Sequence, residues 1–247
     1  MVHGGVMGHR MFVAVVPPDE VREELERFLE PRPGLSWTNP AQWHLTLTFC
    51  PDVDDWRLDE LPERVEAVAR KHEPFTLRLA GAGAFPSVER AKVLWAGVDQ
   101  PEDRPLHALA AGVRSAANAA GCAPDGARFR PHLTLARLGG RDDATAWLRV
   151  LDTFTCSRWE VSEVALVDSF LGEGPRGRAR HEVVARLPLG AGERRWWDPP
   201  GGGLGWAPRR LPYGAWNSSG PSIRLTLSSS SRWSRRHGTS SPTSQCS

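Results

Sequence analysis

Apolar and polar residues alternate along several short stretches of this chain, which is the pattern of β-strands that bury one face. Residues 75–85 and 181–189 show this alternation, whereas residues 11–16, MFVAVV, form a continuous apolar run that ends at a pair of prolines. Two further stretches, 43–49 and 130–137, also alternate, and they share the four-residue word HLTL. The pattern predicts strands at residues 11–16, 43–49, 75–85, 91–98, 130–137, within 153–171 and at 181–189.

A three-to-four-residue spacing of apolar positions predicts helices between these strands. The first helix, residues 18–30, begins with a proline and acidic residues and carries Val21, Leu25, Phe28 and Leu29 on one face. Proline suits the start of a helix because its missing N–H would have no intrahelical partner there. The same spacing predicts further helices at residues 61–72, 105–121 and 142–152.

The order of these elements indicates two related lobes. A helix, an HLTL strand, a helix and two strands follow one another roughly twice along the chain. Strands and helices mixed in this way favour an α+β fold, with two pseudo-symmetric lobes of antiparallel sheet, helices outside and a groove between the lobes. We therefore expect one folded domain at residues 11–190 and a disordered N-terminus at residues 1–10.

Residues 191–247 depart from this pattern. They are rich in Gly, Pro, Ser and Arg, include five tryptophans and have no periodic apolar face. This composition predicts a disordered extension, because it cannot bury enough apolar surface to offset the loss of conformational entropy on folding. Tryptophans between arginines can also stack on single-stranded nucleic acid, but a tail without a function is the simpler interpretation.

The charge of the chain is distributed unevenly. The formal net charge is +2, but eight arginines and only two acidic residues lie beyond Gly190, so the preceding part is acidic overall. A polyanionic ligand must then meet a local cluster of basic residues.

The four cysteines form no Cys-x-x-Cys pair, which argues against a zinc ribbon or a disulfide scaffold and favours a reducing compartment. No stretch has the pattern of a signal peptide or a membrane span, so we expect a cytoplasmic protein without a membrane partner.

The word HLTL places a histidine and a threonine on one face of a strand. Side chains alternate between the two faces, so His44, Thr46 and Thr48 should point one way and the two leucines and Phe49 the other. The leucines then belong to the core, and the polar side chains are presented together on the opposite face.

The second word repeats this arrangement, with His132 and Thr134 on one face. If an approximate two-fold axis relates the lobes, both polar faces meet in the groove. Imidazole titrates near neutrality, so one ring can act as a base while the other acts as an acid. Threonine hydroxyls can donate hydrogen bonds to phosphate oxygens, and a nearby arginine can neutralise the charge of a phosphate.

Two arginines flank the second word and are the candidates for contacts with phosphate. These are Arg130 and Arg137. By simple alternation Arg137 lies on the face of the strand opposite to His132, so it reaches the groove only if the strand ends or twists. No carboxylate adjoins either histidine, so no Ser-His-Asp arrangement is written locally. A zinc site would need a third ligand such as His72, His107 or His181, and nothing in their spacing favours one. We expect neither a metal nor a cofactor.

The paired His-x-Thr-x words resemble the signature of the 2H phosphoesterases, and in this form they look like those of the RNA 2′,3′-cyclic phosphodiesterase (2′-5′ RNA ligase) family. The resemblance extends over about residues 10–190 and excludes the tail. The other stretches that carry it are MFVAVVPPDEV, WTNPAQWHLTLTF, GAFPSVERAKVLWAGV, FRPHLTLAR and VDSFLGEGPRGRARHEVVARLPL.

The resemblance implies hydrolysis of a terminal RNA 2′,3′-cyclic phosphodiester to a 2′-phosphomonoester, without a metal ion. It assigns His44 as the proton donor to the departing 3′ oxygen and His132 as the proton acceptor that activates water, with Thr46 and Thr134 holding the phosphate. The residues by themselves leave open which histidine does which. The implied partner is RNA with a cyclic phosphate end, tRNA fragments among the candidates, and we expect a monomer. The reverse reaction, 2′-5′ joining of RNA ends, is chemically allowed.

Two positions depart from the family pattern. A Leu-Gly turn usually follows the first motif, where this chain has CPDV at residues 50–53, and a tyrosine is common where His181 stands. We interpret His181 as a surface residue at the end of a strand in preference to a third groove histidine that binds phosphate. Phe85 either packs in the core or stacks on a base.

Two alternative functions remain open. The paired motifs do not define the rest of the substrate, so a phosphodiesterase for small cyclic nucleotides or for ADP-ribose cyclic phosphate fits them too. The alternative of a different class is a non-catalytic RNA-binding protein that uses the groove and the basic tail.

Overall fold

A computed structural model of the chain describes residues 8–124, 126, 128–174, 177–191 and 195–196. The chain divides into two units, residues 1–200 and 201–247, and every described residue lies in the first. The described strands are β1 (His9–Val15), β2 (Leu45–Val53), β3 (Phe75–Phe85), β4 (Ala91–Asp99), β5 (Leu133–Asp142), β6 (Trp159–Val161), β7 (Glu163–Phe170), β8 (Arg180–Pro188) and β9 (Arg195–Trp196). The described helices are α1 (Asp19–Leu29), α2 (Glu60–Ala69), α3 (Pro105–Ala119) and α4 (Thr145–Leu151), with short 3-10 turns at Pro40–Gln42 and Asp55–Arg57.

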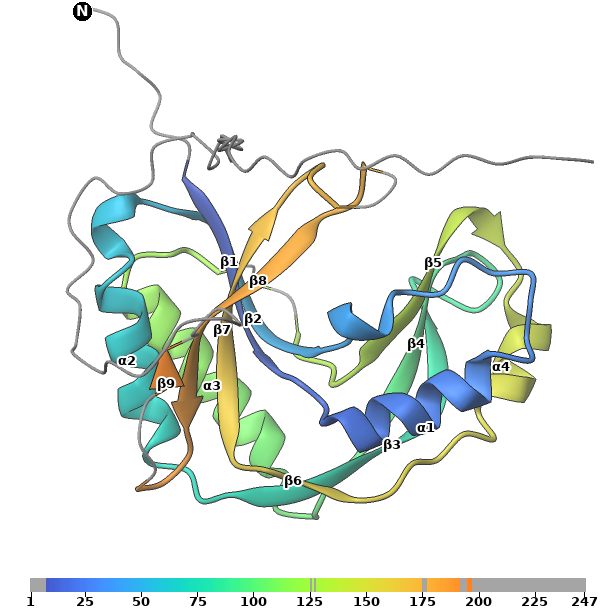
Figure 1. Ribbon diagram of the computed structural model, residues 1–247, viewed down its shortest axis with the longest axis horizontal. Helices are drawn as coiled ribbons and strands as arrows, with labels where there is room; N and C mark the ends of the chain where they lie inside the picture. Colours follow the sequence, from blue (N-terminus) through green and yellow to red (C-terminus); the bar gives the residue numbers. More distant parts are fainter. Residues whose placement is uncertain (1–7, 125, 127, 175–176, 192–194, 197–247) are drawn as a thin grey trace, which may run out of the picture. The chain divides into compact units, whose positions relative to one another are not determined.

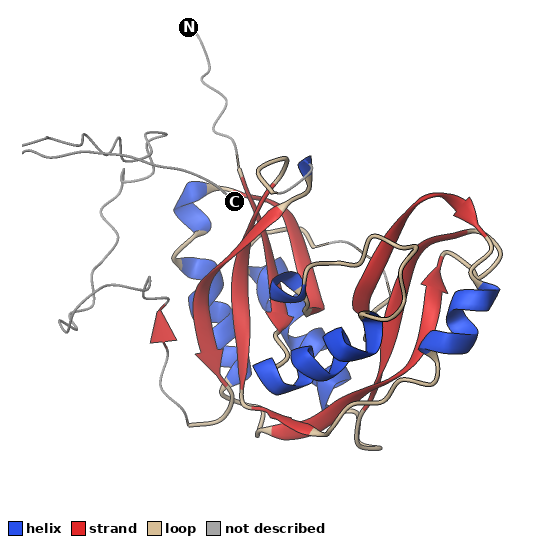
Figure 2. Ribbon diagram, turned by 45° about the vertical axis from the view of Figure 1, so that its right-hand side comes forward, coloured by secondary structure: helices blue, strands red, loops and turns tan. Residues whose placement is uncertain are grey.

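The strands form one continuous sheet in the order β6-β3-β4-β5-β2-β1-β7-β8-β9, and each neighbouring pair is antiparallel. The sheet curls between β5 and β2, which are joined by a single residue pair, Leu45 with Leu133. Figures 1 and 2 show the result, two groups of strands with the helices on the outer sides. This is the two-lobed α+β fold that the sequence pattern indicates.

The two lobes are not consecutive halves of the chain. The first lobe consists of β1, β2, β7, β8 and β9 with α2 and α3, whereas the second consists of β3 to β6 with α1 and α4 (Figure 1). Helix α1 lies early in the chain, yet Phe28 packs on Phe154 at a ring-centroid distance of 4.9 Å, and Ser157 N donates to Glu24 Oε2. Strand β7 lies late in the chain and pairs with β1. The apparent repetition of elements along the sequence therefore does not divide the chain at one point.

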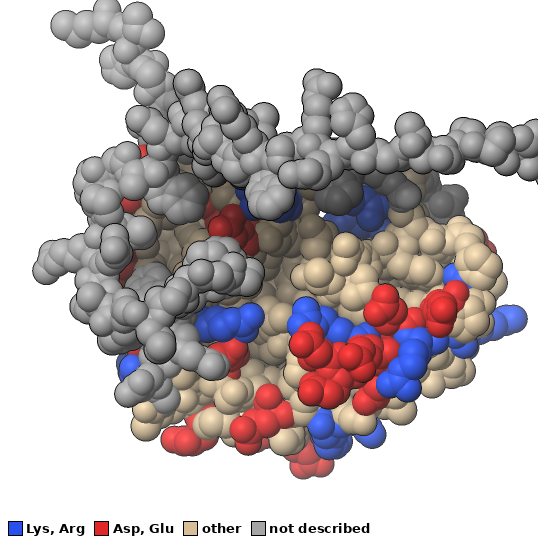
Figure 3. Space-filling view, viewed as in Figure 1, with Lys and Arg blue, Asp and Glu red and all other residues tan. Residues whose placement is uncertain are grey.

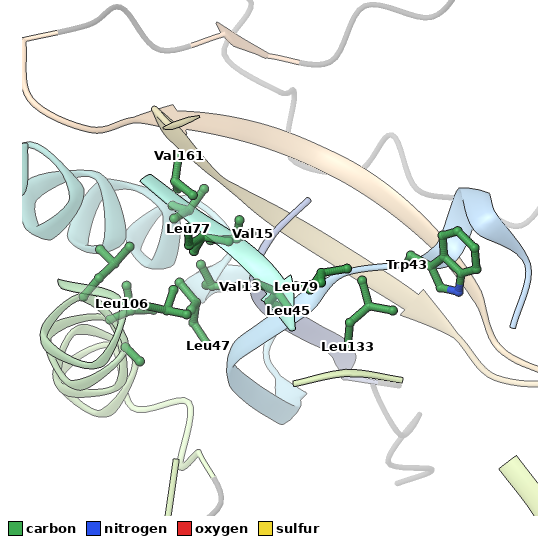
Figure 4. Close-up of a cluster of buried hydrophobic side chains, with 14 of the residues drawn as sticks. Val13, Val15, Trp43, Leu45, Leu47, Leu77, Leu79, Leu106, Leu133 and Val161 are labelled. Atoms are coloured by element: carbon green, nitrogen blue, oxygen red, sulfur yellow. The ribbon is translucent and has the colours of Figure 1, made fainter. Parts of the chain in front are cut away.

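Most of the buried apolar side chains form one cluster that runs through both lobes. In the sheet its members include Val13, Leu45, Leu79 and Leu133, each no more than 1% exposed, and Figure 4 shows Leu45, Leu79 and Leu133 close together. A smaller cluster lies on the opposite face of the first lobe's sheet. It consists of Phe12, Ala14, Ala165 and Val167, with Val16, Phe49 and Val183 packed against it. The two faces of β1 are thus both apolar, which explains its continuous hydrophobic run.

Several boundaries differ from the expected ones. Strand β1 begins at His9, so residues 9 and 10 belong to the fold and not to a disordered N-terminus. Strand β2 continues through the CPDV segment to Val53, and β5 continues to Asp142, which the sequence pattern placed in a helix. Residues 1–7 and most of 191–247 lie outside the described residues, but Arg195–Trp196 pairs with β8 as β9. Within the described part, no helix is long and apolar enough to cross a membrane.

Acidic and basic side chains mix on the face of the molecule that carries α1. Figure 3 shows both kinds over this helix, whose first turn contains Asp19 and Glu20 and whose last turn contains Arg27. Acids at the start of a helix and bases at its end are favourable because they oppose the helix dipole. This surface is explained by helix stability and needs no ligand.

We predict that Leu133→Ala lowers the free energy of unfolding by roughly 2–5 kcal/mol, because removing a buried leucine leaves a cavity. Leu133 is 0% exposed and forms the pair that joins the two groups of strands. Urea unfolding followed by circular dichroism measures the change. The control, Leu171→Ala, alters a side chain that is 62% exposed and should change the value by less than about 0.5 kcal/mol. Equal losses in the two variants would contradict the role given to Leu133.

Candidate active site

A bulge in the first motif strand changes which side chains share a face. Along β1 and β2, Ala14 pairs with Thr46 but Val13 pairs with Thr48, so Leu47 is an extra residue on β2. An extra residue reverses the alternation of side chains beyond it. Thr48 therefore lies buried opposite Val13, and Phe49 pairs with Phe12 on the other face. The expectation that Thr48 shares a face with the histidine, and Phe49 with the leucines, is wrong for this reason.

The second motif strand has a bulge at the corresponding place. Trp95 of β4 pairs with Thr134, whereas Leu94 pairs with Ala136, so the residue between them on β5 is extra. Arg137 then pairs with Val93 and returns to the face of Thr134. The expectation that Arg137 faces away from His132 is wrong, because simple alternation of side chains takes no account of a bulge.

Both motif histidines are held by the same local hydrogen bond. His44 Nδ1 lies 2.7 Å from the carbonyl oxygen of Gln42, and His132 Nδ1 lies 2.7 Å from that of Arg130. A carbonyl oxygen only accepts, so each Nδ1 carries the proton that it donates. Each neutral ring therefore keeps its lone pair on Nε2, which is the nitrogen left for chemistry.

The pairing of β2 with β5 brings the two motifs together. Leu45 pairs with Leu133, and each of these leucines lies between the histidine and the threonine of its own motif. The charge of His132 acts on His44, as expected for two rings in one site. The structure thus brings the two motifs together at this pair, with the two histidines close enough for their charges to interact.

Aromatic rings support each histidine. The ring of His44 stacks on Phe12 at a centroid distance of 4.6 Å, and His181 meets His44 edge-on at 5.3 Å. On the other side, His132 meets Phe85 at 4.9 Å and Trp95 at 6.2 Å. The interpretation of His181 as a separate surface residue is wrong, since β8 brings its half-buried ring against His44. Phe12 was not singled out either, and its only sequence signal is its place in an apolar strand.

The two candidate arginines occupy different places. The guanidinium of Arg130 lies over the rings of Trp95 and Phe85, at 5.4 and 5.8 Å from their centroids. Arg137 is exposed, and its charge acts on all three histidines, His44, His132 and His181. Arg137 is therefore the basic group that all three imidazoles share.

Burial and positive charge keep these imidazoles neutral. Burial lowers the pKa of His44 to about 4, assisted by the charges of His181, His132 and Arg137 and opposed by the hydrogen bond to Gln42. Burial also lowers the pKa of His132, again against the effect of its backbone hydrogen bond. The pKa of His181 is lowered by burial and by Arg137. A bound anion would reverse part of this effect, because negative charge favours the protonated ring.

Within the described residues, no group of three or more His, Cys, Asp or Glu side chains is arranged to hold a metal ion. His107, named above as a possible third ligand, instead packs on Phe129 at 5.2 Å and hydrogen-bonds Gln100.

Comparison with known proteins gives consistent matches. The family model described as the 2′-5′ RNA ligase superfamily matches residues 17–171. The RNA 2′,3′-cyclic phosphodiesterase of Aquifex aeolicus is 30% identical over 156 residues, 62% of this chain and 82% of the relative. The protein of the same name from Geobacillus stearothermophilus is 31% identical over 184 residues, 72% of this chain, which spans only 56% of that relative.

Solved structures agree with these matches. The protein TT0787 of Thermus thermophilus superposes with a TM-score of 0.59 and 30% identity, covering 74% of this chain and 100% of that one. LigT of E. coli, solved with 3′-AMP, gives a TM-score of 0.58 and 27% identity, covering 74% and 98%. The chain therefore belongs to the 2′-5′ RNA ligase superfamily, and the fold and enzyme class indicated by its paired motifs are confirmed.

We predict that Arg137→Gln raises the pKa of His132 and of His44, because the substitution removes a positive charge that disfavours both imidazolium forms. Titration of the histidine ring protons by NMR measures the shifts. The matched control is Arg128→Gln, because the charge of Arg128 acts on His107. It should raise the pKa of His107 and leave the groove histidines unchanged. An unaltered His132 titration in Arg137→Gln would show that Arg137 does not reach the site.

Proposed function

We propose that this enzyme hydrolyses RNA 2′,3′-cyclic phosphodiester ends to 2′-phosphomonoesters by metal-independent acid–base catalysis with two histidines. The observation that carries the proposal is the matched hydrogen bond of His44 and His132 to the backbone carbonyl two residues before each. This bond leaves both Nε2 atoms for proton transfer in one site. The curated relatives from Aquifex aeolicus and Geobacillus stearothermophilus carry the name of this activity.

The two rings divide the proton transfers between them. His132 Nε2 accepts a proton from a water molecule as the oxygen of that water attacks phosphorus. The bond from phosphorus to the 3′ oxygen breaks, and His44 gives that oxygen its proton from Nε2. The products are a 2′-phosphate and a free 3′ hydroxyl, and proton exchange with solvent restores both rings. A correctly placed acid or base contributes about 10²- to 10⁴-fold to such a reaction.

The remaining candidate residues bind the phosphate and its nucleotide. Thr46 and Thr134 donate hydroxyl hydrogen bonds to phosphate oxygens. Arg137 balances the charge that develops on the phosphate. Arg130 lies over the rings of Trp95 and Phe85, where it contacts the nucleotide next to His132.

The low pKa of His44 determines when it can act. With a pKa of about 4, this ring is neutral in the free enzyme near pH 7. The anionic phosphodiester raises that pKa when it binds, and the proton that His44 donates is taken up with the substrate. The role of His44 as donor thus depends on the charge of the substrate.

We predict that His44→Gln and His132→Gln each lower kcat at least a hundredfold on an oligonucleotide ending in a 2′,3′-cyclic phosphate. Wild-type protein should form the 2′-phosphate product with EDTA present. The control, His72→Gln, alters a half-buried histidine beside Gly112 of α3, outside the groove, and should retain activity. Turnover that EDTA abolishes, or an unchanged substrate, would refute the proposal. Turnover of small cyclic nucleotides or ADP-ribose cyclic phosphate in preference to RNA would show that RNA is not the preferred substrate.

We predict a bell-shaped dependence of kcat/KM on pH with its maximum below pH 6.5. This parameter reports the free enzyme, in which the productive form has His44 protonated and His132 neutral. Because the pKa of His44 is lowered to about 4 and that of His132 is also lowered, both limbs of the profile lie below the ordinary range of imidazole. The profile of kcat should lie at higher pH, because bound phosphate raises both values. Steady-state rates across the pH range test this. A single sigmoid, or a kcat/KM maximum above pH 7, would contradict the division of roles.

A further inference from the structure

A third imidazole lies beside His44. His181 is on β8, where it pairs with Ser169 of β7. Its ring meets His44 edge-on at 5.3 Å and Phe12 edge-on at 5.0 Å, with interplanar angles of 76° and 75°. The three rings pack as one unit, so His181 is fixed in position by the same Phe12 ring that supports His44.

The two nitrogens of His181 have different surroundings. Nδ1 is buried and has no hydrogen-bond partner among the described residues. Nε2 has no partner among these residues either, but unlike Nδ1 it is not fully buried. The neighbouring Arg180 is engaged by Glu173 and Glu182, and the charge that acts on His181 is that of Arg137.

These surroundings indicate which nitrogen carries the proton. A buried N–H without an acceptor is rarer and costlier than a buried acceptor without a donor. The neutral ring therefore leaves Nδ1 bare and carries its hydrogen on Nε2. This is the opposite tautomer to that of His44 and His132, whose Nδ1 atoms donate to backbone carbonyls. Two of the three rings thus present a lone pair, and one presents a hydrogen-bond donor.

We propose that His181 donates a hydrogen bond from Nε2 to a non-bridging oxygen of the substrate phosphate, beside His44. A ring-centroid distance of 5.3 Å allows both rings to reach oxygens of one phosphate group. The two motif histidines gain and lose protons during the reaction, whereas His181 keeps its own and supports the phosphate throughout. This assignment names a substrate-binding residue and rests on the proposed function.

Isosteric variants separate the donor from the ring. His181→Phe keeps an aromatic ring on Phe12 and His44 but removes the donor. His181→Gln places an amide N–H near the position of Nε2, and His181→Asn places one near the position of Nδ1. We expect kcat/KM on the cyclic-phosphate oligonucleotide to fall about ten- to a hundredfold in His181→Phe and His181→Asn, as for a lost hydrogen bond to a charged group. His181→Gln should stay within about fivefold of wild type.

A binding measurement keeps this test independent of turnover. The affinity for inorganic phosphate, measured by calorimetry, should fall in His181→Phe and be largely restored in His181→Gln. Thermal unfolding of each variant shows whether the fold persists. Equal losses of phosphate affinity in His181→Gln and His181→Phe, or wild-type affinity in His181→Phe, would overturn the assignment. An NMR spectrum that shows His181 as the Nδ1–H tautomer would overturn it too. If phosphate binding follows this pattern but the RNA is not hydrolysed, the proposed function fails and the contact stands.

Discussion

The arrangement of the site depends on one residue pair, Leu45 with Leu133, where the curled sheet passes from one lobe to the other. Both leucines are almost completely buried, so the pair is held by the core. Because each leucine follows a motif histidine directly, fixing the leucines also fixes the histidines and threonines next to them. Groups that must be placed to a fraction of an ångström are best carried by residues whose neighbours are closely packed. The chemistry of the groove therefore depends on apolar contacts on the other face of the sheet.

The motif residues could be predicted because they obey the simplest rule of a strand. His44 and Thr46, like their counterparts in the second word, precede any irregularity, so alternation alone places them correctly. Beyond the third motif position the rule fails in both strands, for Thr48 and Phe49 in one and Arg137 in the other. A bulge is decided by how two strands fit each other, and a single strand's sequence does not record it.

The residues that sequence reasoning missed depend on contacts between distant segments. His181 joins the site because β8 pairs with β7, which in turn pairs with β1. Phe12 contributes because it lies on the face of β1 that meets His44, and a continuous apolar run does not show which of its residues will contact a site. The order of helices and strands likewise indicated two lobes but not how the chain divides between them, because the long-range pairing of β1 with β7 is not a local property.

Helix α1 and strands β7 and β8 each pack on elements that lie far away in the sequence, so the order of synthesis affects when each lobe is completed. The first motif is made well before β7 and β8, and these two strands of the first lobe are complete only when the chain has been made to Pro188. Helix α1 is also made well before its packing partners, because Phe28 packs on Phe154. The first lobe is therefore completed only after all strands of the second lobe, β3 to β6, have been made. The motif histidine His44 is therefore made long before β8 brings His181 against its ring.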